Sequence, residues 1–157
     1  MNNLCADIGY RSLIKYGEEL CGDNIQVIEK DDGSTIIVLA DGLGSGVKAN
    51  ILSTLTSKIL STMMAQGMKV EDCVETMAQT LPVCSVRGVA YSTFTIIYIR
   101  DNDEADIIQY DNPDVILLRN GQNYDYPQTI SDICGKKISR STIKLCEDDI
   151  FIAMSDG

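Results

Sequence analysis

The sequence predicts an α+β fold in which two helices lie between two groups of antiparallel strands. Apolar and β-branched runs come first, two stretches with the helical period follow, and the rest of the chain alternates as strands do. A doubly wound parallel sheet would instead alternate strands with single helices. The 157 residues suffice for one ordinary domain with a buried core, and we expect residues 1–157 to form it.

Three strands are predicted before the first helix. A short one is expected near residues 5–10 and a second over residues 25–28. Residues 34–40 are nearly all apolar and rich in β-branched side chains, which is typical of a central strand buried on both faces. The turn-forming sequence at residues 31–33 separates the last two strands, so we expect a hairpin that ends at Asp41.

Two helices are predicted after a glycine-rich turn. Apolar side chains recur at helical spacing over residues 47–64, with serine, threonine and lysine between them, and we expect the apolar face to pack on the sheet. The same spacing continues over residues 70–81. Gly67 is suited to end the first helix, and Pro82 is suited to end the second.

An antiparallel meander is predicted for the rest of the chain. Polar turn sequences at residues 101–104 and 120–121 separate runs of strand-like alternation. The strands are expected at residues 90–99, 105–110, 115–119, 138–145 and 150–154. They complete the α+β prediction.

The charge of the chain excludes some classes of partner. The sequence has 23 acidic and 13 basic residues, which give a formal net charge of −10. Nucleic acids and acidic membrane surfaces both need a basic surface to bind. No run approaches the roughly 18 apolar residues that cross a bilayer. Residues 1–7 also lack the basic and apolar parts of a secretion signal. We therefore expect no nucleic acid partner and no membrane segment.

The cysteines and the absence of histidine limit the chemistry. Six cysteines are spread along the chain without a C-x-x-C pair, and there is no histidine. These facts remove the usual zinc patterns and imidazole as a general base. Scattered cysteines without a secretion signal are typical of reduced thiols, so we expect a cytoplasmic location.

The glycine-rich turn at residues 42–46 allows three interpretations. A dinucleotide fingerprint would need glycine or alanine where Val47 stands, and a P-loop would need a Gly-Lys-Ser or Gly-Lys-Thr triplet that the chain lacks. The third interpretation begins with Asp41, which a buried strand would hold rigidly beside glycine. Carboxylate and carbonyl oxygens are the donors that Mg²⁺ and Mn²⁺ select. An isolated Asp-Gly, however, is more often only a turn that caps the next helix.

Two other acidic residues stand beside glycine at strand ends. Asp23 precedes the strand expected at residues 25–28, and Asp156 follows the strand expected at residues 150–154. If these strands are neighbours, Asp23, Asp41 and Asp156 can converge at one edge of a sandwich. The sequence therefore predicts a carboxylate site at that edge.

Five segments of the chain carry a resemblance to a known family. They are residues 17–24, 40–49, 91–95, 111–121 and the Ser-Asp-Gly of residues 155–157. In this order they resemble the bacterial, sporulation-protein-E-type branch of the PP2C-type metal-dependent protein phosphatases. The resemblance implies a four-layer α/β/β/α sandwich of two antiparallel sheets flanked by helices. It also implies that the last helices and the final strand of the family, with one further metal ligand, lie outside residues 1–157.

The resemblance implies a site for two Mn²⁺ or Mg²⁺ ions. Asp41 would bridge both ions, and the Gly42 carbonyl would bind one of them. Asp23 would contribute at the first ion, directly or through water, and Asp156 would bind the other. Such a pair activates a water for in-line attack on phosphorus. Asp41 and Asp23 are thus the implied catalytic residues. A phosphoserine or phosphothreonine protein, such as an anti-anti-sigma-type regulator, is the implied substrate.

Two departures from the family pattern leave an alternative open. Leu43 stands where the eukaryotic branch has a histidine that acts as an acid, so we expect a water to protonate the leaving group. Without the last ligand, the second metal would bind weakly, and we predict low activity. The alternative function is a non-catalytic regulatory module that binds a partner and keeps a vestigial metal site.

Overall fold

The computed structural model describes residues 4–80 and 92–156, which contain two helices and nine strands. The large sheet has the order β1-β2-β3-β4-β8-β7 and is antiparallel throughout. Its strands are β1 (Asp23–Glu29), β2 (Thr35–Gly42), β3 (Ser92–Arg100), β4 (Glu104–Tyr110), β7 (Thr129–Ile133) and β8 (Lys136–Lys144). The small sheet, in the order β6-β5-β9, consists of β5 (Ile116–Arg119), β6 (Gln122–Asn123) and β9 (Ile150–Ile152). The helices are α1 (Gly46–Ala65) and α2 (Val70–Thr80).

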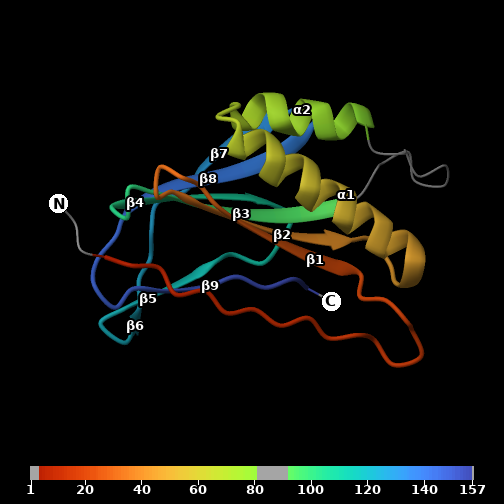
Figure 1. Cartoon of the computed structure of the whole chain (residues 1–157), viewed down its shortest axis with the longest axis horizontal. Coiled ribbons are helices and arrows are strands. Elements are labelled where there is room, and N and C mark those ends of the chain that lie inside the picture. The colour runs from red at the N-terminus through yellow and green to blue at the C-terminus, as the bar shows by residue number, and fades with distance from the viewer. Residues whose placement is uncertain (1–3, 81–91, 157) are drawn as a thin grey trace.

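The elements are stacked in layers (Figure 1). Both helices cover one face of the large sheet, and the small sheet lies on the opposite side. One apolar core, with Phe94 and Leu60, fills the space between the helices and the large sheet. A second core, with Ile97 and Leu117, joins the two sheets. The predicted α+β class with two antiparallel sheets is confirmed, and the described residues build three layers of the sandwich.

Strand β2 divides its side chains between the two cores. Ile36, Val38 and Ala40 are fully buried in the core beneath the helices, whereas Ile37 packs between the sheets. Alternation along the strand places Asp41 on the same face as Ile37, which is the side of the small sheet. The strand continues through Gly42 and is paired on both sides, so Asp41 lies within a central strand and not in the turn that follows it.

Helix α1 packs on the sheet with only part of the predicted apolar face, which includes Leu52, Leu60 and Met64. Its buried residues are Ala49, Leu52, Ser53, Thr56, Ser57, Leu60, Ser61 and Met64. Val47, Ile51 and Leu55, which were expected on the packed face, are 62%, 50% and 40% exposed. Small hydroxyl side chains let the helix lie close to the strands and supply hydrogen bonds. The Ser57 hydroxyl, for example, donates to Asn24 Oδ1 of β1 at 2.8 Å.

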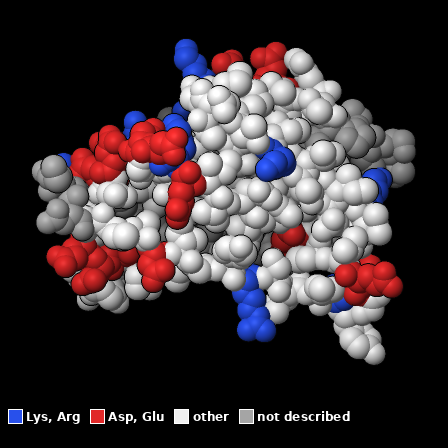
Figure 2. All heavy atoms as spheres, in the orientation of Figure 1, with Lys and Arg blue, Asp and Glu red and all other residues white. Residues whose placement is uncertain are grey.

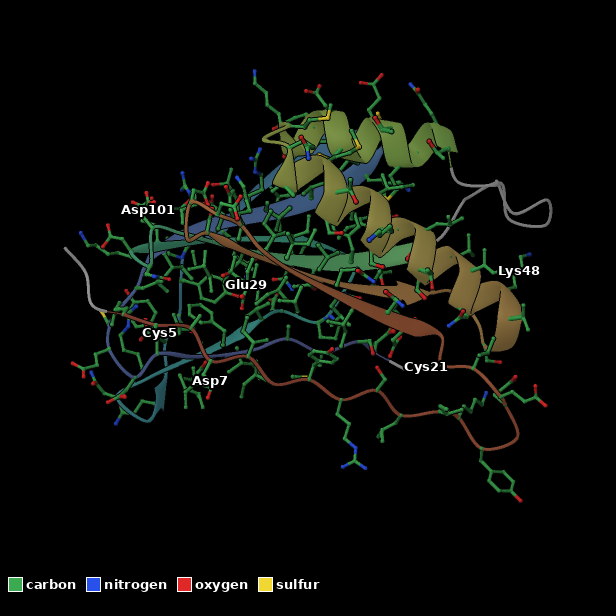
Figure 3. All side chains as sticks on the ribbon, viewed as in Figure 1. Cys5, Asp7, Cys21, Glu29, Lys48 and Asp101 are labelled. Atoms are coloured by element: carbon green, nitrogen blue, oxygen red, sulfur yellow. The ribbon has the colours of Figure 1, made fainter. Side chains whose placement is uncertain are left out.

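Other predictions failed at exposed or polar segments. Residues 5–10, expected as a strand, have no regular secondary structure, and Figure 3 labels Cys5 and Asp7 along this part of the chain. They line a cavity of about 530 Å³ together with residues of the large sheet and β9. Strands β6 and β7 were not predicted because their side chains are mostly exposed and lack apolar alternation. The helix end expected at Pro82 and the strand start expected at residues 90–91 lie outside the described residues.

Acidic side chains are visible at both ends of the molecule in Figure 2, and more of them lie at the end away from the start of α1. In this view the acidic side chains gather mainly at the end of the molecule where the β1–β2 and β3–β4 turns lie. These turns carry Asp31, Asp32, Asp101 and Asp103. Asp41 is near the other end of β2, so its neighbourhood is distinct from this charged end. Within residues 4–80 and 92–156, no helix has the length and apolar character needed to cross a membrane.

Candidate carboxylate site

Two of the three predicted acidic residues meet across neighbouring strands. Asp23 is the first residue of β1, and the antiparallel register places it directly opposite Asp41 of β2. Side chains of directly opposed residues lie on the same face with Cβ atoms about 5 Å apart. Figure 3 labels Cys21, two residues before the start of β1, and Lys48, in the first turn of α1. The predicted hairpin is confirmed.

The third acidic residue reaches the pair from the small sheet. Residues 153–156 continue from β9 without regular structure and end on Ser155 and Asp156. The Ser155 hydroxyl donates to Asp23 Oδ2 at 2.8 Å, across 132 residues of sequence. Asp156 contacts the Asp41 carboxyl group. The structure therefore brings together all three carboxylates that the sequence singled out.

Burial and the crowding of the three carboxyl groups strongly raise the pKa of Asp41. Burial, then the negative charge of Asp23, then contact with Asp156 raise the pKa of Asp41 from 3.8 to about 7. Each cause disfavours the ionised form, because a charge loses hydration on burial and is repelled by charges of the same sign. A perturbed carboxyl group among other acids is typical of functional sites.

Gly42 is required by the packing of α1 against β2. A Cβ atom at this position would lie 1.9 Å from the Ala49 carbonyl oxygen, which no side chain could tolerate without movement of the backbone. The Gly42 amide donates to the Gly22 carbonyl at 3.0 Å and ties the turn to the residue before Asp23. The sequence predicted glycine here for the approach of an ion, and the structure adds the close approach of a helix.

Glu18 contacts the glycine-rich turn, and the sequence did not single it out. The Ser45 hydroxyl, at the start of α1, donates to Glu18 Oε1 at 2.8 Å instead of capping the helix. Gly46, with φ of +75°, lies so close that an added Cβ would be 2.8 Å from Glu18 Oε2. No signal in the sequence links residues 27 positions apart in this way, so pattern reasoning could not find the pair.

A second set of polar side chains lies beside Asp41, on the neighbouring strand β3 and on the segment that follows β4. Thr93 of β3 is the register partner of Asp41 on the side away from Asp23. Its hydroxyl donates to Asn112 Oδ1 at 2.6 Å, and Asn112 Nδ2 donates to Thr95 Oγ1 at 3.1 Å. Their positions two residues apart on one strand place both threonines on the Asp41 face.

The donor set fits a hard divalent cation, although its present geometry is not that of a metal cage. The available donors are carboxylate oxygens and a backbone carbonyl, which Mg²⁺ and Mn²⁺ prefer. A cation would also relieve the like-charge repulsion that raises the pKa of Asp41. In the described part of the chain, however, no group of three or more acidic, cysteine or histidine side chains is arranged to hold an ion. The carboxyl groups contact one another and Ser155 instead.

Solved structures share the fold. RsbX, solved in complex with magnesium, is 26% identical with a TM-score of 0.71, over 93% of this chain and 71% of the RsbX chain. The SpoIIE phosphatase domain of Bacillus subtilis, solved with a fragment of its regulatory domain, is 21% identical with a TM-score of 0.75, over 94% of this chain and 44% of that one.

A structure from the bacterial stressosome, described as a modular system adapted to control secondary messenger signaling, also matches. It is 18% identical with a TM-score of 0.73, over 93% of this chain and 74% of that one. Below 25% identity such likeness establishes the fold alone. No curated protein matches the sequence.

The sequence itself matches a family model. The model is described as Stage II sporulation protein E (SpoIIE), and it matches residues 31–157, which include Asp41 and Asp156. Asp23 precedes the matched range, and the structure attaches it to the site through the register of β1 and β2. The match spans most of the chain and agrees with the fold of the solved structures, so this chain belongs to the SpoIIE family.

Proposed function

We propose that this chain is a metal-dependent protein phosphatase that hydrolyses phosphoserine or phosphothreonine. The observation that carries the proposal is the convergence of Asp23, Asp41 and Asp156 from both sheets on one partly buried place. Membership of the SpoIIE family and the fold shared with PP2C-type phosphatase domains support phosphatase chemistry. Carboxylates that converge in this way suit the two-metal hydrolysis of phosphate esters.

Two Mn²⁺ or Mg²⁺ ions are the proposed cofactors. The carboxylates of Asp23, Asp41 and Asp156 and the carbonyl of Gly42 would hold them. When bound, such ions supply positive charge that lowers the pKa of a water and offsets charge on the phosphoryl oxygens. The magnesium complex of the structurally similar RsbX supports this choice.

The residues of this chain would act by positioning and by charge. Asp41 is held in a strand paired on both sides, and its backbone carbonyl accepts a hydrogen bond from the Ser92 hydroxyl at 3.0 Å. Its backbone and Cβ atom are therefore held with little freedom beside the proposed metal site. Because the sequence has no histidine, a water is the proposed acid for the leaving group.

The test compares two aspartate-to-asparagine substitutions. The whole chain is assayed with phosphoserine and phosphothreonine peptides, with Mn²⁺ and with chelator. We expect Mn²⁺-dependent hydrolysis that Asp41→Asn reduces at least about a hundredfold, because the substitution removes a charged metal ligand. Asp101→Asn is the matched control, since Asp101 lies in the distant β3–β4 turn with φ of +51°, which asparagine tolerates. A rate of hydrolysis that is the same with Mn²⁺ and with chelator, or that is unchanged in Asp41→Asn, would exclude the proposal.

We propose a regulatory phosphoprotein, such as an anti-anti-sigma-type regulator, as the substrate. The solved relatives include the RsbU and RsbW domains of a Mycobacterium tuberculosis protein and a component of the bacterial stressosome, and this supports a signalling role. The formal net charge of −10 argues against nucleic acid as the partner. The five cysteines in the described residues are free thiols, which supports a reducing compartment such as the cytoplasm.

One observation favours a second function. The carboxyl groups contact each other and are not arranged as ligands within residues 4–80 and 92–156. A non-catalytic module that binds a protein partner through this fold, with a vestigial metal site, would show that geometry. Calorimetry with Mn²⁺ together with the hydrolysis assay separates the two functions, because a chain that binds no Mn²⁺, or binds it without hydrolysing phosphopeptides, is not the proposed phosphatase.

A further inference from the structure

We propose that Ser155 is a positioning residue that orients Asp23 for cation binding, an inference that rests on the proposed metal-dependent function. The Ser155 hydroxyl donates to Asp23 Oδ2 at 2.8 Å. An ionised carboxylate only accepts hydrogen bonds, so the serine is the donor. This bond joins the segment after β9 to the first strand, and it engages one of the two oxygens of Asp23.

The bond matters because aspartate does not fix its own carboxylate plane. The last torsion of an aspartate side chain is broad and roughly two-fold, so backbone placement leaves the direction of the oxygens open. Register with Asp41 positions the Cβ atom of Asp23 but not its oxygens. With Oδ2 held by Ser155, the carboxylate loses that freedom, and Oδ1 is left for other contacts.

Asp156, the residue after Ser155, makes a similar contact with the second carboxylate of the pair. Ser155 contacts Asp23 while Asp156 contacts Asp41, so two consecutive residues engage two opposed carboxylates. Both come from the segment after β9, which belongs to the small sheet, whereas Asp23 and Asp41 belong to the large sheet. The Ser155 bond therefore also sets where Asp156 lies relative to Asp41. Groups that orient metal ligands in this way typically change metal affinity by about 10- to 100-fold when removed.

The experiment measures the dissociation constant for Mn²⁺ by calorimetry on the whole chain. Ser155→Ala should weaken binding about tenfold or more, because both Asp23 and Asp156 lose their fixed positions. Ser155→Thr keeps the hydroxyl donor, so near-normal affinity should return. Ser139→Ala is the matched control: Ser139 also donates a hydrogen bond, to Gln128 Oε1 at 2.7 Å, but it lies in β8, which β3 and β4 separate from β2.

The outcomes separate positioning from mere stabilisation. Thermal unfolding of the same variants identifies any loss of folded protein, and affinity is compared at a temperature where all are folded. An unchanged dissociation constant in Ser155→Ala overturns this inference, and so does equal weakening in Ser155→Thr. A wild-type chain that binds Mn²⁺ without hydrolysing phosphopeptides overturns the phosphatase proposal alone. A wild-type chain that binds no Mn²⁺ overturns both.

Discussion

At the scale of single residues, Asp41 is the most perturbed acid of the site. Its position in a central strand, opposite Asp23 and beside Asp156, raises its pKa to about 7 through burial first and like charge second. The metal-free folded protein thus holds a proton on Asp41 at pH values where the unfolded chain, with a pKa of 3.8, has released it. This difference makes stability depend on pH.

The sign of the dependence gives a prediction. Between about pH 4 and pH 7 the folded state binds more protons at Asp41 than the unfolded state does, so the free energy of unfolding falls as pH rises. Asp41→Asn removes the ionisable group, so we expect the variant to be more stable than the wild type at pH 8, with a smaller difference at pH 5. Urea unfolding in the presence of chelator measures this.

Asp101→Asn again serves as the control and should show no such change with pH. A variant destabilised equally at both pH values would contradict the assigned cause. Stability gained on removal of the Asp41 carboxyl group would show that the crowding of these carboxylates opposes folding in the absence of a cation.

Residues of this site differ in how far the sequence reveals them. Asp23, Asp41 and Asp156 are predictable because each stands beside glycine at the end of an apolar run. Ser155, although it adjoins one of them, acquires its contact only when β9 is placed near β1. The same holds for Glu18 on Ser45, since bonds between side chains distant in sequence follow from tertiary packing and leave no local pattern.

At the scale of elements, the position of α1 depends on a single glycine. The helix approaches β2 so closely at Ala49 that Gly42 cannot carry a side chain. The close approach brings the start of the helix, and the turn before it, next to Asp41. Sequence periodicity could not show this, because the packed face of α1 contains serine and threonine where apolar residues were expected.

Gly42→Ala should therefore destabilise the protein strongly. A Cβ atom 1.9 Å from the Ala49 carbonyl oxygen forces the helix and strand apart, and such overpacking costs about 1–3 kcal/mol or more. Gly9→Ala is the matched control, because nothing lies within 4 Å of a Cβ placed there. It should change the free energy of unfolding by less than about 1 kcal/mol. Equal effects of the two substitutions in urea unfolding would rule out the packing explanation.

At the scale of the whole molecule, the fold class was predictable from the sequence, but the structure of exposed peripheral segments was not. Strong apolar runs such as residues 34–40 and two consecutive helical stretches were enough for the α+β class with antiparallel sheets. Strand β7 and the irregular residues 5–10 were mispredicted because exposed segments take their structure from neighbours and not from their own apolar pattern. The chain covers 71% of RsbX but 44% of the solved SpoIIE chain, so part of each relative has no counterpart in it.

This difference in length leads to a prediction about turnover. In the described residues no group of three or more acidic, cysteine or histidine side chains is arranged to hold an ion, and parts of both solved relatives have no counterpart in the chain. We expect this chain to hydrolyse p-nitrophenyl phosphate with Mn²⁺ well below the rate of a full-length relative, and to need higher Mn²⁺ concentrations. Parallel assays of the chain and of RsbX across a Mn²⁺ titration measure both quantities. Turnover by the chain comparable to that of RsbX at the same Mn²⁺ concentration would refute this prediction.

The hydroxyl-rich face of α1 has a consequence for motion. Of its eight buried residues, Ser53, Thr56, Ser57 and Ser61 contribute little apolar area, and the Thr56 hydroxyl has no hydrogen-bond partner among the described residues. A buried hydroxyl without a partner costs about 1–3 kcal/mol. Because half of its buried side chains carry hydroxyl groups, detachment of α1 from the sheet exposes less apolar surface than its 20 residues would suggest. Local opening, detectable as faster amide hydrogen exchange, should begin in this helix and loosen the turn beside Asp41 before the sheets separate.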